Sequence, residues 1–124
     1  MKILSSKAHG VIDYLLVAFL LLSPTIFKME GDLRTITYAL GAAHLLITIL
    51  TDFEVGVFKV IPFRIHGLIE IVVALALGGL AFWFNSNGSD LGFYFFSLLA
   101  VAVLLVFVLT DFKSAPSRRL GEAS

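Results

Sequence analysis

Four long apolar stretches dominate this chain of 124 residues, and they constrain its fold more than any other feature. A helix needs about 20 residues, each rising ~1.5 Å, to cross the hydrocarbon core of a bilayer. Charged residues make up only 15% of the chain, whereas a typical soluble domain has about 25%. We therefore predict an all-α polytopic membrane protein whose partner is the lipid bilayer. Its four transmembrane helices are expected over Ala8–Phe27, Leu33–Thr51, Ile65–Phe84 and Leu91–Phe112.

The basic residues predict the orientation of these helices, because Lys and Arg are retained on the cytoplasmic side of a membrane. Seven of the nine basic residues fall in the amino-terminal segment, the middle loop or the carboxyl-terminal tail, which all lie on one side. Both termini are therefore predicted to be cytoplasmic. Nine acidic residues balance the nine basic ones, so no positive surplus points to a nucleic-acid partner. The absence of cysteine excludes disulfide scaffolds, thiol redox catalysis and thiolate metal sites.

Two segments of the first half recur in the second half. With a shift of 57 residues, Lys7–Asp13 (KAHGVID) aligns with Arg64–Glu70 (RIHGLIE). With a shift of 59 residues, Leu45–Phe53 aligns with Leu104–Phe112, and six of these nine positions are identical. Each predicted repeat therefore comprises two helices, begins with a His-Gly motif and ends with Thr-Asp-Phe. An even number of spans gives both repeats the same orientation, so they form two tandem parallel-repeat helical hairpins.

The repeats set the domain organisation that we expect. The whole chain forms a single membrane domain, in which repeat 1 covers about 7–53, an interfacial linker 54–63, repeat 2 about 64–112, and a cytoplasmic tail 113–124. The linker is apolar apart from Glu54 and Lys59. Such a composition is typical of a segment that lies in the membrane interface.

The polar residues that recur are predicted to gather in one layer at the cytoplasmic ends of the helices. Within each repeat the histidine and the acidic residue are four positions apart, which places both on one helix face. If each repeat folds as a hairpin, its terminal Thr-Asp pair returns close to its own histidine, so that Thr51 lies near His9 and Thr110 near His66. The candidate polar cluster comprises His9, Asp13, Asp52, His66, Glu70 and Asp111.

Three interpretations compete for this cluster. In the first, which is our main expectation, the His–acid pairs hydrogen-bond across helices, while Gly10 and Gly67 allow close backbone approach. In the second, Asp13 and Glu70 take up protons or cations, because carboxylates inside the apolar region are costly and need partners. In the third, histidine nitrogens and carboxylate oxygens bind a metal ion. The sequence shows no nucleophile constellation, so we predict no catalytic residue and no cofactor.

The second predicted helix carries a small and polar stripe that its copy lacks. The members of this stripe recur at helical spacing along one face and are Thr37, Gly41, His44, Thr48 and Thr51. Val103 stands in the second repeat where His44 stands in the first. In one interpretation the threonine hydroxyls bond back to their own helix, and His44 bonds a neighbour such as Tyr14 or Tyr38. In the other, the stripe is a polar lane that joins the cluster to the membrane midplane.

One further motif points to a family. Leu21-Leu22-Ser23-Pro24 is followed by apolar residues and preceded by His9-Gly-x-x-Asp13, and the arrangement recurs after a two-helix unit. This architecture resembles the SPW-repeat integral membrane proteins of bacteria over residues 7–112, with Thr25 where that family has Trp. The resemblance implies a four-helix, multi-pass protein of the bacterial inner membrane. It implies no activity, because that family has no established biochemical role.

From these features we expect a small membrane protein that serves as a non-catalytic scaffold or interaction module. The first alternative is a proton- or cation-coupled carrier or channel for small solutes, which would use the His/acid cluster. The second alternative is a metal-binding membrane protein. Four helices enclose little volume, so a transport pathway would call for a homodimer.

Overall fold

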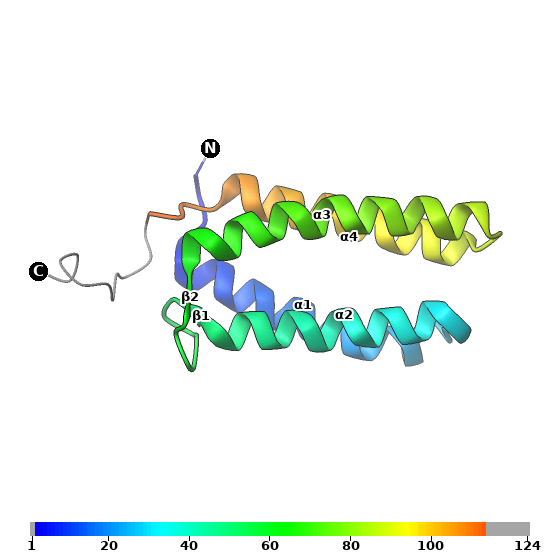
Figure 1. The fold of residues 1–124 in the computed structure, drawn as a ribbon, viewed down its shortest axis with the longest axis horizontal. Helices are drawn as coiled ribbons and strands as arrows, with labels where there is room; N and C mark the ends of the chain where they lie inside the picture. Colours follow the sequence, from blue (N-terminus) through cyan, green and yellow to red (C-terminus); the bar gives the residue numbers. More distant parts are fainter. Residues whose placement is uncertain (1, 114–124) are drawn as a thin grey trace, which may run out of the picture.

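The computed structural model describes residues 2–113, and these residues form four helices arranged as two hairpins (Figure 1). The first hairpin packs α1 (Ser6–Ile26) against α2 (Gly31–Leu50), and the second packs α3 (Phe63–Ser86) against α4 (Asp90–Leu109). The all-α class and the order of the four predicted helices are confirmed. α4 ends before its predicted limit of Phe112, because Thr110 has extended backbone and pairs with another segment. The predicted tail over 114–124 lies outside the described residues.

Serine caps and a glycine turn set where helices begin. Ser5 accepts a hydrogen bond from the Ala8 N–H at 3.1 Å and so caps α1. Ser89 accepts from the Gly92 N–H at 3.1 Å and caps α4 in the same way. These bonds satisfy backbone donors that have no partner within the helix. Gly88, just before Ser89, has a φ of +81°, a left-handed conformation that glycine adopts readily because it has no Cβ.

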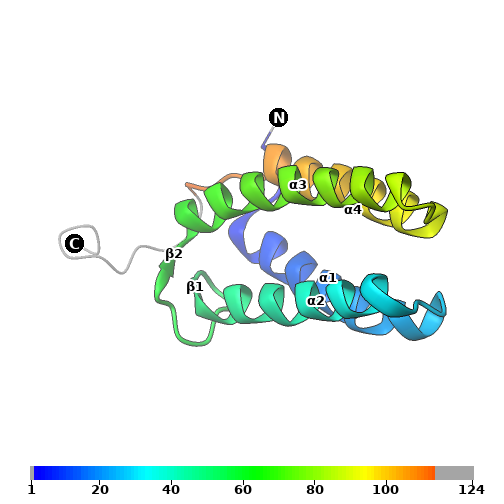
Figure 2. The same cartoon turned by 45° about the vertical axis from the view of Figure 1, so that its right-hand side comes forward.

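Two short parallel pairings join the hairpins, and sequence reasoning missed both. β1 (Thr51–Asp52) pairs with β2 (Ile61–Pro62), and Leu4 forms a parallel bridge with Thr110. In each pairing, the segment that leaves one hairpin lies beside the segment that leads into the other. We call this end of the molecule, which includes both pairings and the linker between β1 and β2, the joined end. Figures 1 and 2 show all four helices projecting from it in the same general direction.

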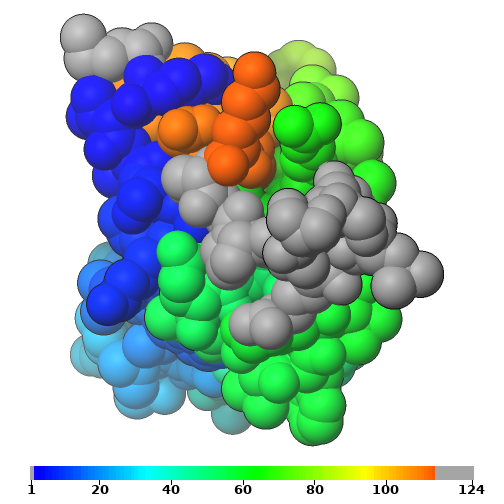
Figure 3. All heavy atoms as spheres, turned by 90° about the vertical axis from the view of Figure 1, so that its left-hand side faces the viewer, coloured from blue at the N-terminus to red at the C-terminus, as the bar shows by residue number. Residues whose placement is uncertain are grey.

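The linker forms much of the surface of the joined end. Figure 3 looks onto this end, where the blue amino-terminal segment lies beside the orange segment that follows α4, and the green linker lies near both. The apolar side chains of Val57, Phe58 and Val60 are exposed on the linker. Phe53, at its start, is fully buried. An exposed apolar edge beside a buried anchor suits the interfacial position that the sequence predicts.

Apolar side chains also cover the outer surface of the helices. Leu75 is 73% exposed, Phe82 72% and Leu98 70%. The interior is filled instead by a core of buried residues from all four helices, such as Leu20, Leu33, Leu77 and Phe96. Large apolar side chains exposed on all sides are unfavourable in water and favourable in lipid. All four helices are long and apolar enough to cross a membrane, which supports a multi-pass membrane protein.

Candidate metal centre

Four buried polar side chains converge between the two hairpins. His9 and Asp13 come from α1, and His66 and Glu70 come from α3. One nitrogen or oxygen atom from each of the four lies within 4.8 Å of the corresponding atoms of the other three. These are the residues that the recurring His-Gly motif places at matching positions in the two halves. The structure thus brings together the central part of the predicted polar cluster.

The shortest contacts in this cluster run between the hairpins. His9 Nε2 lies 3.0 Å from Glu70 Oε2, and His66 Nε2 lies 3.1 Å from Asp13 Oδ2. The contacts within one helix are longer, 3.4 Å between His9 and Asp13 and 3.9 Å between His66 and Glu70. Each histidine therefore lies nearest the carboxylate of the other half. The cluster consequently fastens α1 to α3.

Two threonines orient the imidazole rings from behind. His9 Nδ1 lies 2.7 Å from Thr110 Oγ1, and His66 Nδ1 lies 2.8 Å from Thr51 Oγ1. Each threonine hydroxyl donates its single proton to the carbonyl one helical turn earlier. The hydroxyl oxygen is then left to accept, so the Nδ1–H of each histidine is the donor. This arrangement turns the Nε2 atom of each ring into the cluster, where a neutral imidazole presents a lone pair.

The pairing of threonines with histidines corrects the sequence prediction. Thr51 was expected near His9 and Thr110 near His66, each within its own hairpin, and this is wrong. Thr51 contacts His66 and Thr110 contacts His9. The pairs cross because the extended segments after α2 and α4 each pair with the segment that leads into the opposite hairpin.

Several inward-facing atoms of the cluster lack hydrogen-bond geometry. They are close together, yet their angles do not form hydrogen bonds among the described residues. Buried polar atoms without a partner are costly in an apolar interior, and they are rare in folded proteins. A cation at their centre would satisfy several of them at once. The atoms concerned are His9 Nε2, Asp13 Oδ2, His44 Nε2, His66 Nε2 and Glu70 Oε1.

His44 of α2 makes the cluster asymmetric. Its Nε2 atom lies 3.5 Å from Asp13 Oδ1, and its side chain is 16% exposed. The partners that the sequence suggested are wrong, because the Tyr14 hydroxyl donates to the Val55 carbonyl at 2.8 Å and the Tyr38 ring lies beside Arg34. His44 therefore belongs to the edge of the cluster.

The other polar members of the stripe on α2 turn back to their own helix. The hydroxyls of Thr37 and Thr48 donate to the carbonyls of Leu33 and His44, each at 2.7 Å, and both side chains are buried. The interpretation in which these hydroxyls bond their own helix is confirmed. Donors used in this way do not favour a continuous polar lane toward the midplane.

Two of the predicted cluster residues lie outside the group of converging atoms. Asp52 is half-buried in β1, beside Pro62 of β2. Asp111 is also half-buried, and its side chain accepts a hydrogen bond from the Lys113 N–H at 3.0 Å. Its own N–H donates to the Leu4 carbonyl at 2.8 Å. Both aspartates therefore take part in the joined end, and neither offers a ligand atom to the four-residue group.

Phenylalanine rings wall the cluster off on the side of the joined end. Phe63 lies 5.3 Å from the His9 ring and 4.8 Å from Phe112, and Phe53 lies 5.8 Å from the His66 ring, measured between centroids. Sequence reasoning missed this role, although Phe recurs at the end of both Thr-Asp-Phe motifs. The apolar wall keeps bulk water from the buried charges.

The glycine of each His-Gly motif makes room for one of these rings. A Cβ atom at Gly10 would lie 2.9 Å from the Phe53 ring and 2.2 Å from Val55. A Cβ atom at Gly67 would lie 2.7 Å from the Phe112 ring. The sequence predicted close backbone approach at these glycines, but the nearest atoms at both belong to side chains, so this detail is corrected. The two recurring motifs meet here, since the start of each hairpin accommodates the end of the same hairpin.

No family model, curated protein or solved structure matches this chain. The resemblance to SPW-repeat membrane proteins therefore stays a prediction.

Proposed function

We propose that this chain is a metal-binding protein of the bacterial inner membrane, with both termini in the cytoplasm. Its ligands are His9, Asp13, His66 and Glu70, and the ion bound is a divalent transition metal. The observation that carries the proposal is the convergence of four buried ligand atoms within 4.8 Å of one another. Two tandem repeats, related by a pseudo-twofold axis along the membrane normal, would then share one metal ion.

The donor set suits such an ion. Imidazole nitrogen and carboxylate oxygen together are typical ligands of zinc, iron, manganese and cobalt. Metal-bound histidines usually donate their second ring N–H to an oxygen, and here Thr110 and Thr51 accept those N–H groups. The rings would therefore be held in the tautomer that metal binding requires.

Charge balance also supports a dication. Two ionised carboxylates and two neutral imidazoles carry a charge of −2, which a divalent cation neutralises within the apolar interior. An isolated charge at this depth would be costly. The Nε2 atoms of His9 and His66 lie 3.0 and 3.1 Å from the Glu70 and Asp13 carboxylates, so two protonated histidines would also balance the charge by direct ion pairing. The angles of both pairs fall outside hydrogen-bond geometry among the described residues, and a cation between them would be coordinated by all four groups.

Matched contacts in the two halves support the proposed repeat. The His9–Thr110 contact corresponds to the His66–Thr51 contact under the shifts of 57 and 59 residues. The Leu4–Thr110 bridge corresponds to the Ile61–Thr51 pairing in the same way. Single cysteines introduced at Ser5 and Ser86 of this cysteine-free chain test the orientation. A membrane-impermeant maleimide should label Ser86→Cys from the periplasm and Ser5→Cys only after permeabilisation.

Metal content of the full chain, purified in detergent, tests the proposed function. After treatment with a chelator, the protein should bind Co²⁺ or Zn²⁺ stoichiometrically, as measured by elemental analysis and by the visible spectrum of Co²⁺. The variant His9→Gln/His66→Gln should lose this binding. The variant Asp52→Asn/Asp111→Asn is the matched control and should keep it, because both aspartates lie outside the converging group. Equal binding by wild type and by His9→Gln/His66→Gln would refute the metal centre and leave the scaffold interpretation.

A further inference from the structure

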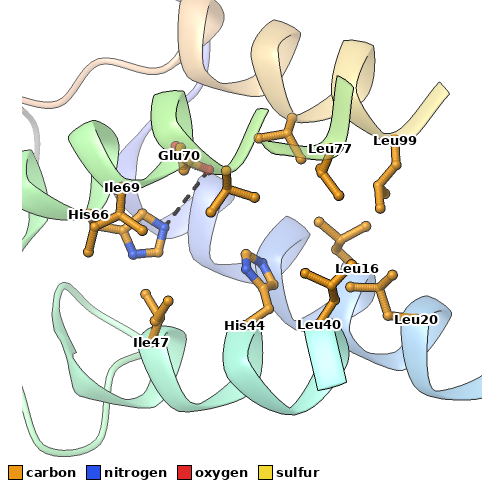
Figure 4. A pocket seen from close by; sticks show the side chains of 12 residues that line it. Leu16, Leu20, Leu40, His44, Ile47, His66, Ile69, Glu70, Leu77 and Leu99 are labelled. Atoms are coloured by element: carbon orange, nitrogen blue, oxygen red, sulfur yellow. Dashed lines mark ion pairs between the residues drawn. The ribbon is translucent and has the colours of Figure 1, made fainter. Parts of the chain in front are cut away.

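A cavity of about 40 Å³ adjoins the cluster between the two hairpins (Figure 4). His44, His66 and Glu70 line one end of it, and leucines such as Leu20, Leu77 and Leu99 line the other. A space of this size holds water, provided that polar partners are present. The polar end supplies those partners, whereas the leucines exclude larger hydrated ions.

We propose that this cavity is the open coordination side of the metal centre, where a water molecule or a small anion of azide size binds the metal. This proposal rests on the metal centre proposed above. Metals that prefer five or six ligands remain short of full coordination with four protein ligands, and sites with an open position are typical of reactive rather than purely structural metals. The apolar part of the cavity leaves room for such a ligand.

Two buried atoms that the four-ligand set does not use support this assignment. Glu70 approaches the histidines through Oε2, while its Oε1 atom is buried and without a hydrogen-bond partner among the described residues. His44 Nε2, which lies 3.5 Å from Asp13 Oδ1, is also buried without a hydrogen bond among the described residues. Both residues line the cavity. A water molecule there would donate to Glu70 Oε1, which would satisfy a buried acceptor that the fold leaves open.

The residue that differs between the two halves, His44, also lies on the cavity side of the cluster. In the first half His44 stands next to Asp13, whereas in the second half the corresponding residue is Val103, which also lines the cavity. A site used only to fasten the halves together would not need an extra histidine on one side. The extra histidine lies where a bound water or anion would need a polar neighbour.

Azide binding to the Co²⁺-loaded full chain tests the proposal, because an exogenous ligand on Co²⁺ changes its visible spectrum. We expect a saturable change in the wild type. Leu77→Phe fills the cavity and should weaken azide binding by at least about tenfold, since a packed core resists extra volume. Leu75→Phe is the matched control on the same helix, where the side chain is 73% exposed and lies outside the cavity, and it should bind azide like the wild type.

The outcomes separate this proposal from the metal centre. A Co²⁺ spectrum that azide does not change would overturn the open side and leave the metal centre standing. Equal azide binding by Leu77→Phe and Leu75→Phe would also overturn it, because azide would then bind elsewhere. Failure of the wild type to bind Co²⁺ would overturn both proposals. Leu40→Phe, at a half-buried lining position, replaces Leu77→Phe if that variant does not fold.

Discussion

Each hairpin supplies one histidine and one carboxylate to the cluster, but the two differ in what lies behind the carboxylate. Asp13 has His44 at 3.5 Å from its Oδ1 atom. Glu70 has Val103 at the corresponding position, and its Oε1 atom is without a hydrogen-bond partner among the described residues. The two His–carboxylate pairs therefore account for the proposed binding of a cation between the halves. The additional histidine marks the side on which we propose that a further ligand binds.

The halves also differ in how the cluster is covered. Beside Gly10 lie Phe53 and Val55 of the linker, which is anchored by the Tyr14 hydroxyl to the Val55 carbonyl and by Ser6 to the Glu54 carboxylate at 2.7 Å. The three atoms nearest a Cβ atom at Gly67 all belong to the ring of Phe112, which is half-buried. One side of the cluster is thus covered by this hydrogen-bonded strap of the linker, and the other by the Phe112 ring, which packs against Phe63.

Substitution of the ligand histidines should cause the largest loss of Co²⁺ affinity. The loss should be the same for His9 and for His66. His9→Gln and His66→Gln each remove an inward Nε2 atom, and each should lower Co²⁺ affinity by at least about 100-fold, beyond the loss typical of outer-shell changes. Titration followed in the visible range measures both. A large loss in one variant with none in the other would break the equivalence of the halves.

Thr51 and Thr110, which contact the Nδ1 atoms of the two histidines, should contribute equally to metal affinity, and each should contribute less than a histidine ligand does. Thr51→Val and Thr110→Val keep the side-chain shape and remove the oxygen that accepts from Nδ1–H. Each should weaken metal binding by about 10- to 100-fold. The same titration checks the result, and Thr37→Val is the control, because its hydroxyl contacts only its own helix among the described bonds. Unchanged affinity in both variants would show that the threonines do not orient the ligands.

Alanine substitutions at Gly10 and Gly67 should lower the stability of the fold by different amounts, because different side chains cover the two glycines. Gly10→Ala places a Cβ atom 2.2 Å from Val55 in a strap that is held in place, whereas the atoms nearest the Cβ atom of Gly67→Ala belong to the half-buried Phe112 ring, at 2.7 Å. Overpacking of this kind costs about 1–3 kcal/mol, and we expect Gly10→Ala at the upper end and Gly67→Ala at the lower end. Thermal unfolding in detergent measures both. A greater loss for Gly67→Ala would contradict the strap.

Replacing His44 with the valine found at the matching position of the second half should have the smallest effect on metal affinity. His44→Val copies the residue of the second half and should change Co²⁺ affinity by less than about tenfold, since His44 is outside the four-ligand group. Its azide affinity should fall clearly. Loss of Co²⁺ binding in His44→Val would make this histidine a fifth ligand.

The sequence predicted the helices and the centre of the cluster, for different physical reasons. Long apolar runs define membrane-spanning helices almost by themselves. The recurrence of His and acid at a spacing of four placed His9, Asp13, His66 and Glu70 on helix faces that could meet. The pairing of Thr51 with His66 could not be predicted in this way, because it depends on extended segments that exchange between the hairpins. Asp52 and Asp111 look equivalent in sequence, yet the ends of α2 and α4 carry them to the edge.

X-ray absorption of the Zn²⁺- or Co²⁺-loaded full chain is the sharpest test of a metal ion bound between the two hairpins, because it reports the atoms bound to the metal. We predict a first shell of nitrogen and oxygen at about 2.0–2.2 Å, with the outer-shell scattering of imidazole rings. That imidazole signal should disappear in His9→Gln/His66→Gln and persist in Asp52→Asn/Asp111→Asn. A shell of oxygen without imidazole scattering, or an identical spectrum in the double histidine variant, would contradict a metal ion held between the two hairpins.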